Sequence, residues 1–328
     1  MRNSTKPSHF STISALISKA KGIEVLYFNA EDVDMDSGRI NGQMIIDDKW
    51  KRVEKSIPKV IDMSAFCVRH REVVSYLRDK AFLTDDLKHR LSKEKLQRIM
   101  LKDTSLAGYT IPSKRIESFD DITKYIDEYR QIVVKPIYSR QGKGVFVIGK
   151  DGSGLTIGAQ REKERISIEK LERIYDKDIK GIPHIVQKSM TSRTLNGDPF
   201  DCRIHLEKNG KGNWRNINTS VRVGIGQSII SNGDGSGRIQ IKPFLQSNYG
   251  DTWEDILEEL NEFGLKLAKR IEKTRKTKLM TLGLDVGIDP EGNLFIFEAN
   301  SAPGVSTIKS EVALTRADYY KYLLDKHS

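Results

Sequence analysis

The stretch "LGLDVGIDPEGNLFIFEANSAPG" (residues 282–304) decides the fold class of this chain. Two alternating apolar runs flank the letters PEGN, which are typical of a tight turn, so the stretch predicts a β-hairpin. Asp285 precedes the turn and Glu298 follows it at a similar distance, and facing residues on paired strands are close neighbours. Asn300 shares a face with Glu298, because side chains two apart on a strand point the same way.

Asp285, Glu298 and Asn300 therefore bring three oxygen donors together at one end of the hairpin. Mg²⁺ takes oxygen ligands and keeps water or phosphate oxygens in the rest of its coordination shell. The alternative is a solvated strand end with a turn-forming asparagine. That alternative leaves two facing carboxylates to repel each other, so the sequence favours a metal site that holds phosphates.

A partner for such phosphates lies upstream, in "VVKPIYSRQGKG" (residues 133–144). Lys135 closes an apolar strand, where a buried lysine is costly unless it meets an anion. Ser139, Gly142 and Gly144 follow in a loop whose backbone N–H groups would close over phosphates. A glycine loop alone is a weak signal, since hairpin turns use glycine as often, but the lysine and the loop together indicate phosphate binding.

Two arginines stand in strand-like sequence between these motifs, Arg203 in "DCRIHL" and Arg222 in "NTSVRVG". An arginine in a strand is usually an exposed cross-strand partner. Here both precede the acidic hairpin, and the guanidinium fork matches phosphate oxygens, so we interpret them as phosphate clamps. We interpret His205 as structural and Cys202 as buried and inert.

Bulk properties set the class of protein. The 328 residues are 38% hydrophobic and 30% charged, as in an ordinary globular protein with room for two or three domains. No apolar run is long enough for a membrane span, and the N-terminal stretch is too polar for a secretory signal. Cys67 and Cys202 give no disulfide framework, so we expect a cytoplasmic protein.

The net charge of +10 indicates anionic partners. The densest basic run (266–278) has helical spacing, which favours a solvated helix face over a nucleic-acid patch.

The order of elements predicts a small opening α/β domain followed by larger units. "GIEVLYFNA" and "PKVIDMSAF" predict buried strands, and the span "DSGRINGQ" between them predicts turns. The later elements are a strand–helix–strand–loop–strand series over 108–150, a helix over 161–178, a strand over 184–190 and a long helix over 252–276.

The motifs "VVKP…GKGV", "IVQKSM", "DCR", "SVR", "GLD" and "FEANSAPG", in this order, resemble the ATP-grasp superfamily of ATP-dependent ligases from about residue 93 to the C-terminus. The hairpin is similar to that of D-alanine–D-alanine ligases. "GDPFDCRIHLEKNGKGNW" and "VLYFNAEDVDMDSGRINGQ" are similar to the endospore coat-associated YheC/YheD family. The resemblance implies an α/β (α+β) ATP-grasp fold in which two subdomains, a small lid (93–190) and a large one (191–328), sandwich ATP. A small N-terminal α/β domain (1–92) precedes them.

The resemblance also implies site residues by matching position. The nucleotide-binding set is Lys135, Ser139, Gly142, Gly144, Gln187, Lys188, Met190 and Asn232, with one further lysine that is either Lys93 or Lys95. Gln187 and the backbone of Lys188 and Met190 would contact adenine. Arg203 and Arg222 would bind the γ-phosphate or an acyl phosphate.

The implied activity is ATP-dependent carboxylate–amine ligation through an acyl phosphate, with ATP and two Mg²⁺ ions as cofactors. The partners would be an amino acid or peptide carboxylate and an amine, with neither membrane nor nucleic acid expected and a homo-oligomer left open. A coat or assembly protein that binds nucleotide without turnover is the rival interpretation, which the intact metal and lysine motifs disfavour. Gly283 stands where D-alanine ligases carry an arginine, which argues against that particular substrate.

Overall fold

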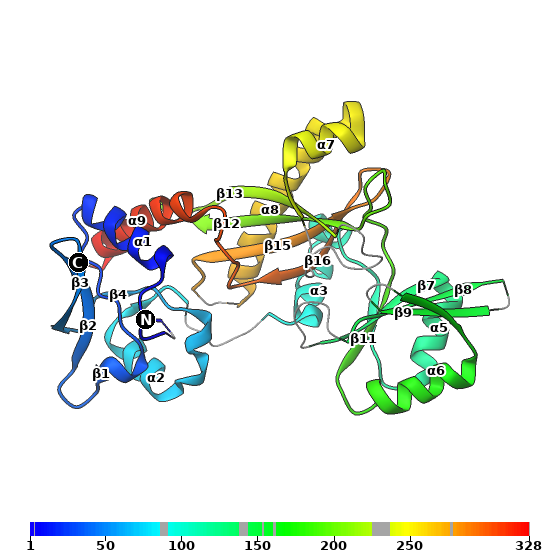
Figure 1. Cartoon of the computed structure of the whole chain (residues 1–328), viewed down its shortest axis with the longest axis horizontal. Helices are drawn as coiled ribbons and strands as arrows, with labels where there is room; N and C mark the ends of the chain where they lie inside the picture. The colour runs from blue at the N-terminus through cyan, green and yellow to red at the C-terminus, as the bar shows by residue number, and fades with distance from the viewer. Residues whose placement is uncertain are drawn as a thin grey trace.

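A computed structural model describes residues 1–2, 4–85, 91–137, 144–152, 154–159, 162–224, 237–275 and 278–327. Three lobes follow one another along the long axis of the molecule (Figure 1). The N-terminal lobe holds both chain ends, the large lobe lies in the middle, and the small lobe lies at the far end. The candidate site residues come from the large lobe, the small lobe and the helix α3 beside them.

The large lobe is built on a five-stranded sheet in the order β14-β13-β12-β15-β16. Its strands are β12 (Phe200–Lys208), β13 (Trp214–Val223), β14 (Gly237–Gln240), β15 (Thr281–Ile288) and β16 (Leu294–Asn300). Each neighbouring pair is antiparallel. Two helices, α7 (Ile241–Tyr249) and α8 (Trp253–Arg275), connect β14 to β15.

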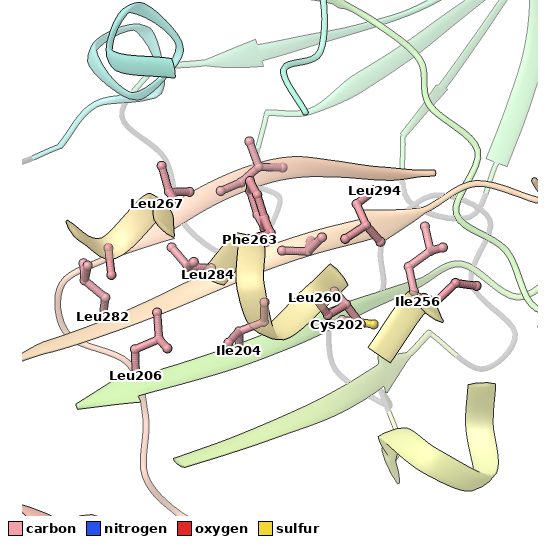
Figure 2. Close-up of a cluster of buried hydrophobic side chains, with 14 of the residues drawn as sticks. Cys202, Ile204, Leu206, Ile256, Leu260, Phe263, Leu267, Leu282, Leu284 and Leu294 are labelled. Atoms are coloured by element: carbon pink, nitrogen blue, oxygen red, sulfur yellow. The ribbon is translucent and has the colours of Figure 1, made fainter. Parts of the chain in front are cut away.

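Helix α8 covers one face of this sheet, and the contact forms the main hydrophobic core (Figure 2). Leu260 and Phe263 of the helix pack against Ile204 and Leu284 of the strands, all of them almost fully buried. Since successive strand residues point to opposite faces, the neighbours of Ile204 and Leu284 along their strands project away from α8. The residues that matter for function stand on that second face.

The predicted hairpin is confirmed. Strands β15 and β16 pair antiparallel, Asp285 faces Glu298, and Gly283 faces Asn300. The register shifts between Asp285 and Val286, which marks a β-bulge directly beside the acidic pair. The turn is fixed by Asp289, whose side chain accepts backbone hydrogen bonds from both Glu291 and Asn293.

The small lobe has a six-stranded sheet in the order β10-β9-β8-β7-β11-β6. Its strands are β6 (Ser113–Arg115), β7 (Gln131–Pro136), β8 (Phe146–Asp151), β9 (Gly154–Ala159), β10 (Glu162–Ile166) and β11 (His184–Lys188). Helices α5 (Phe119–Tyr129) and α6 (Ile168–Ile174) supply its separate core with residues such as Ile122 and Leu171, and a π turn (Tyr175–Ile179) follows α6.

The helix predicted over 161–178 is therefore correct only in its second half, because residues 162–166 form the edge strand β10. This strand reads EKERI, and it opens the charged stretch that predicts a helix. Charged side chains are equally typical of an edge strand, where they hinder pairing with another chain.

Helix α3 (Lys93–Leu101) and the short helix α4 (Thr104–Ala107) precede the small lobe in the sequence. Their apolar residues Leu96, Met100 and Leu106 are buried in the core of the large lobe. Both helices thus pack on the large sheet, and the domain boundaries given above remain a prediction.

The N-terminal lobe differs most from expectation. Its elements are α1 (His9–Ala20), a 3-10 turn (Ala30–Asp32), β1 (Val33–Asp34), β2 (Arg39–Ile46), β3 (Lys49–Ser56), β4 (Val60–Ile61), a 3-10 turn (Ala65–Arg69), α2 (Arg71–Lys80) and β5 (Phe82–Leu83). The strand predicted over 22–30 is wrong, since only Tyr27 forms a bridge there, to Gln43. The span predicted as turns is mostly strand β2, and the strand predicted over 58–66 shrinks to β4.

The C-terminal helix α9 (Lys309–Lys326) joins the N-terminal lobe to the large sheet. Arg316 donates to both oxygens of Glu207 on β12, at 3.0 and 2.8 Å, and lies 3.8 Å from Asp62. The hydroxyl of Tyr320 donates to Asp62 at 2.6 Å. All four residues are largely buried, so these pairs hold the lobes together with little screening by solvent.

Among the described helices, none is long and apolar enough to span a bilayer.

Candidate active site

Strand β12 places the first charged pair of the site. Asp201 and Arg203 are two residues apart, so both project from the face opposite α8. Asp201 faces Arg222 on β13, and Arg203 faces Asp285 on β15. With Glu298 paired to Asp285, the sheet carries a continuous row of charged side chains across four strands, and the charges alternate in sign except at the two facing carboxylates.

The row is closed by hydrogen bonds. Arg203 donates from Nε and Nη2 to the two oxygens of Asp285, the second at 2.9 Å. Arg222 donates in the same two-pronged way to Asp201, with Nε to Oδ1 at 2.8 Å. Its Nη2 also lies 2.8 Å from Asp285 Oδ2. Asp285 thus anchors two arginines at once, which fixes both guanidinium planes.

Burial sets the electrostatics of this row. Asp285 and Asp201 are each 2% exposed and Arg222 is 7% exposed. Burial alone would raise the pKa of the Asp285 carboxyl, but the charges and hydrogen bonds of Arg203 and Arg222 outweigh it and hold that pKa below its usual value. Asp285 is therefore an anion at neutral pH although it is out of contact with bulk water.

Glu298 is the exception in the row. Burial and the neighbouring Asp285 carboxylate raise the pKa of Glu298, and the opposing effects of Lys93, Arg203 and Lys135 do not fully compensate. The Lys93 ammonium lies 3.8 Å from Glu298 Oε2. Glu298, unlike Asp285, is thus short of positive charge, and a cation beside it would favour its ionised form.

Lys135 enters from the small lobe, at the end of β7. Its side chain is buried, and Nζ donates to Gln187 Oε1 on the neighbouring strand β11 at 2.5 Å. Burial, then the charge of Lys93, lowers the pKa of Lys135 to about 7, against the opposing effect of Glu298. A buried lysine held only by a neutral amide is costly to keep protonated, so the predicted role of Lys135 in binding an anion stays a prediction that its burial favours.

The structure separates the two lysines that the sequence left open. Lys93 stands in the first turn of α3 and points at Glu298. Lys95 lines a hollow between α3 and α8 together with Arg98 and Arg270. Lys93 is therefore the one of the two that lies with the site residues.

The donor chemistry fits a hard cation. Asp285, Glu298 and Asn300 supply carboxylate and amide oxygens, which suit Mg²⁺, and Asn300 Oδ1 at present accepts from the backbone N–H of Ala302 at 2.9 Å. Across the described residues, no cluster of three or more His, Cys, Asp or Glu side chains is placed to hold a metal. A metal here would thus need the amide and ligand oxygens besides the two carboxylates.

Only some of the remaining predicted residues belong to the part of the chain that the structure describes. Ser139, Gly142 and Asn232 lie outside the described residues. Gly144 adopts a φ of +72°, and a Cβ there would lie 3.0 Å from Pro136, so this loop position requires glycine. The N–H of Lys188 donates to the carbonyl of Pro112 at 2.9 Å, and Met190 follows β11 half-buried.

Sequence reasoning missed two features of the site. Asp201 anchors Arg222, and the signal for it was the spacing of Asp201 and Arg203 in "DCR", which places both on one strand face. The other feature is the contact of Gly283 with Pro303. A Cβ at position 283 would lie 2.7 Å from the Pro303 Cβ, so the bend after β16 fills the place of a side chain.

Comparison with solved structures identifies the fold. The ATP-grasp ligase PsnB, solved with a minimal precursor, Mg and ADP, superposes with a TM-score of 0.52 at 10% identity, over 98% of this chain and 96% of that chain. D-cycloserine synthetase DcsG gives 0.52 at 12% identity, over 94% and 93% of the two chains. The protein has the ATP-grasp fold.

Sequence comparison gives the family. A model described as YheC/D-like ATP-grasp matches residues 87–326, so the chain belongs to that family. Endospore coat-associated protein YheD of Bacillus subtilis (strain 168) is 23% identical over 311 residues, covering 90% of this chain and 68% of that protein. Endospore coat-associated protein YheC of the same strain is 20% identical over 317 residues, covering 92% and 87%. The resemblance noted in the sequence is confirmed.

Proposed function

We propose that the protein is an ATP-dependent carboxylate–amine ligase that works through an acyl phosphate. The observation that carries the proposal is that two lysines and two arginines gather around one pair of carboxylates. Lys93 and Lys135 act on Glu298, and Arg203 and Arg222 are paired with Asp285 on the sheet. This arrangement suits a triphosphate bound between the lobes.

Lys93 and Lys135 would bind the phosphates nearest the nucleoside. Lys135 is buried beside Gln187, so a phosphate oxygen would complete its shell and restore its full charge. Gln187, with the backbone of Lys188 and Met190, would contact adenine. Ser139, Gly142, Gly144 and Asn232 are proposed to close over the phosphates.

Asp285, Glu298 and Asn300 would hold Mg²⁺, with two ions proposed. The metal would supply positive charge against the oxygens of the transferring phosphoryl group. Asp285 would then serve both the metal and the arginines, which ties the position of the cation to the position of the guanidinium groups.

The reaction needs no nucleophilic side chain. A carboxylate oxygen of the substrate attacks the γ-phosphorus, the bond to the ADP oxygen breaks, and an acyl phosphate forms. The amine nitrogen then attacks the acyl carbon, phosphate leaves with the C–O bond electrons, and the amine gives up a proton. Arg203 and Arg222 would bind the γ-phosphate oxygens and later the acyl phosphate. Their anchoring to Asp201 and Asp285 means that little reorganisation is needed.

The substrate class that we propose is an amino acid or peptide carboxylate. PsnB is described with a peptide precursor and DcsG as a synthetase of an amino-acid derivative, which supports this class by analogy alone. D-alanine is the exception. Its ligases resemble this chain in the hairpin but carry an arginine at the place of Gly283, and here Pro303 occupies that space.

A second candidate follows from the relatives, which are named as endospore coat-associated proteins. On this hypothesis the protein binds ATP as part of a coat assembly and does not turn it over. We retain the cytoplasm as the predicted compartment of the ligase.

The test is an ADP-release screen across amino acids, short peptides and a cell extract, with Glu298→Gln as the inactive variant. The control is Glu291→Gln, which alters an exposed carboxylate in the turn of the same hairpin. We expect substrate-dependent ADP release by the wild type and the control and none by Glu298→Gln. ATP binding without release in every arm would favour the assembly role, and equal release by Glu298→Gln would remove the metal assignment.

A further inference from the structure

A hollow that is separate from the candidate active site lies between helix α3 and the end of helix α8. Its volume is about 320 Å³. Its lining residues are Leu91, Lys95, Arg98, Ile99, Lys102, Arg270, Thr274 and Arg275. Five of these eight side chains are cationic, and three of the five, Lys95, Arg98 and Lys102, are exposed at the rim.

Two cations of α3, Lys95 and Arg98, share one helix face with Lys102, the C-cap residue of the helix. Lys95, Arg98 and Lys102 are spaced i, i+3 and i+7, so their side chains line up along the hollow. Within the described part of the chain, no carboxylate pairs with any of the three, whereas Arg270 pairs with Asp103 at 3.4 Å. The charges of Lys95, Arg98 and Lys102 are therefore not neutralised by an ion pair with any described residue.

Helix ends explain only part of this charge. Arg275 lies in the last turn of α8, where the helix dipole favours a cation. Lys95 lies in the first turn of α3, where the dipole disfavours one. A cation at the unfavourable end, facing other cations, indicates that the surface is suited to an anion.

The lining residues that are not charged indicate what the uncharged part of a ligand would be. Leu91 and Ile99 supply apolar surface, as do the methylene stems of the lysines and arginines, and Thr274 supplies a hydroxyl. The volume is at the lower end of the range for small-molecule sites, and it is too small for a folded partner or a duplex. Guanidinium groups match the tetrahedral oxygens of phosphate better than a point charge does.

We propose that this pocket binds a small organic phosphate, a phosphate monoester carried on an apolar body. It is distinct from the ATP site because Lys93, which points to Glu298, lies on a different side of α3 from Lys95. The two sites share that one helix, so a ligand in the pocket contacts the element that presents Lys93 to the active site.

The experiment measures the affinity of the full-length protein for phenyl phosphate, inorganic phosphate and benzoate by calorimetry. The test variant is Arg98→Ala with Lys102→Ala. The matched control is Lys269→Ala with Lys273→Ala, which also removes two charges but from exposed positions of α8 that do not line the pocket. A third variant, Lys135→Ala, alters the proposed ATP site alone. Thermal unfolding checks that each variant is folded.

We expect phenyl phosphate to bind more tightly than phosphate or benzoate. Its affinity should fall by at least about tenfold in the test variant and stay within about twofold in the control and in Lys135→Ala. If benzoate binds more tightly than phenyl phosphate, the ligand class is a carboxylate, and the proposed phosphate class is overturned. An equal loss of affinity in the control variant would show that the overall charge of the protein, and not this pocket, determines the binding. Loss in Lys135→Ala would place the probe in the ATP site, and no binding by the folded wild type would refute the pocket.

Discussion

Arg203 and Asp285 face each other on strands β12 and β15, and two hydrogen bonds join the guanidinium group to the carboxylate. The same carboxylate also lies 2.8 Å from Arg222. One aspartate thus balances two largely buried arginines. In the proposed reaction it would also be a metal ligand, so the structural and the catalytic demands on Asp285 coincide.

Replacing this carboxylate by an amide should lower the stability of the folded protein. Asp285→Asn leaves two buried guanidinium groups without their shared anion, which we expect to cost on the order of 3–5 kcal/mol in the free energy of unfolding. Urea denaturation at neutral pH measures this loss. The control is Glu54→Gln, which breaks the exposed pair with Arg39 and should cost less than about 1 kcal/mol. An Asp285→Asn protein as stable as the wild type would show that Asp201 alone balances Arg222.

The hairpin was predictable from the sequence because local signals agree there. Strand alternation, the turn letters and the separation of Asp285 from Glu298 all point to one register, and the structure has that register. The burial of Lys135 was predictable for a similar reason, since it stands at the end of an apolar strand, whereas its role in binding an anion stays a prediction.

The partners of the arginines were not predictable to the same degree. Pairing of Arg222 with Asp201 depends on which strands become neighbours, and a single sequence does not state this. The prediction of strands in the N-terminal lobe failed for a related reason. The apolar residues over 22–30 are buried by contacts with other segments while the backbone stays irregular, so an apolar run was mistaken for a strand.

A second prediction is that buried Lys135 lowers the stability of the nucleotide-free protein. In the unfolded chain Lys135 has an ordinary lysine pKa, whereas in the folded protein burial lowers the pKa of Lys135 to about 7. Between these values the unfolded state binds more protons, so stability rises with pH, and near pH 7 the protonated lysine opposes folding. Lys135→Met should therefore stabilise the nucleotide-free protein, on the order of 1–3 kcal/mol.

The same variant should lose the stabilisation that ATP gives. Thermal unfolding with and without Mg-ATP measures both effects at once. The control is Lys150→Met, an exposed lysine of the same sheet that pairs with Asp127 at 2.7 Å, and it should keep the ATP effect. If Lys135→Met lowers the stability of the nucleotide-free protein, the burial argument is wrong.

A third prediction concerns the bend after β16. Gly283→Ala places a Cβ 2.7 Å from the Pro303 Cβ, so we expect a loss of about 1–3 kcal/mol through overpacking. Adding Pro303→Gly removes the obstructing atom, and the double variant should regain part of the loss. Urea denaturation of the two single variants and the double variant gives the coupling energy. Additive effects of the two changes would show that the bend moves freely and does not shape the substrate site.

The last prediction is that Mg-ATP binding is accompanied by proton uptake in mildly alkaline solution. With a pKa of about 7, Lys135 is mostly neutral at pH 8. A phosphate beside it raises that pKa, so binding should draw in up to about one proton at pH 8 and far less at pH 6. As the pH rises above 7, the affinity should weaken, by up to about tenfold per pH unit. Calorimetry in buffers of different ionisation enthalpy counts the protons. Lys135→Met should abolish the uptake at pH 8 and Lys150→Met should not. Uptake that persists in Lys135→Met would assign the proton to another group, and its absence from the wild type would place Lys135 away from the phosphates.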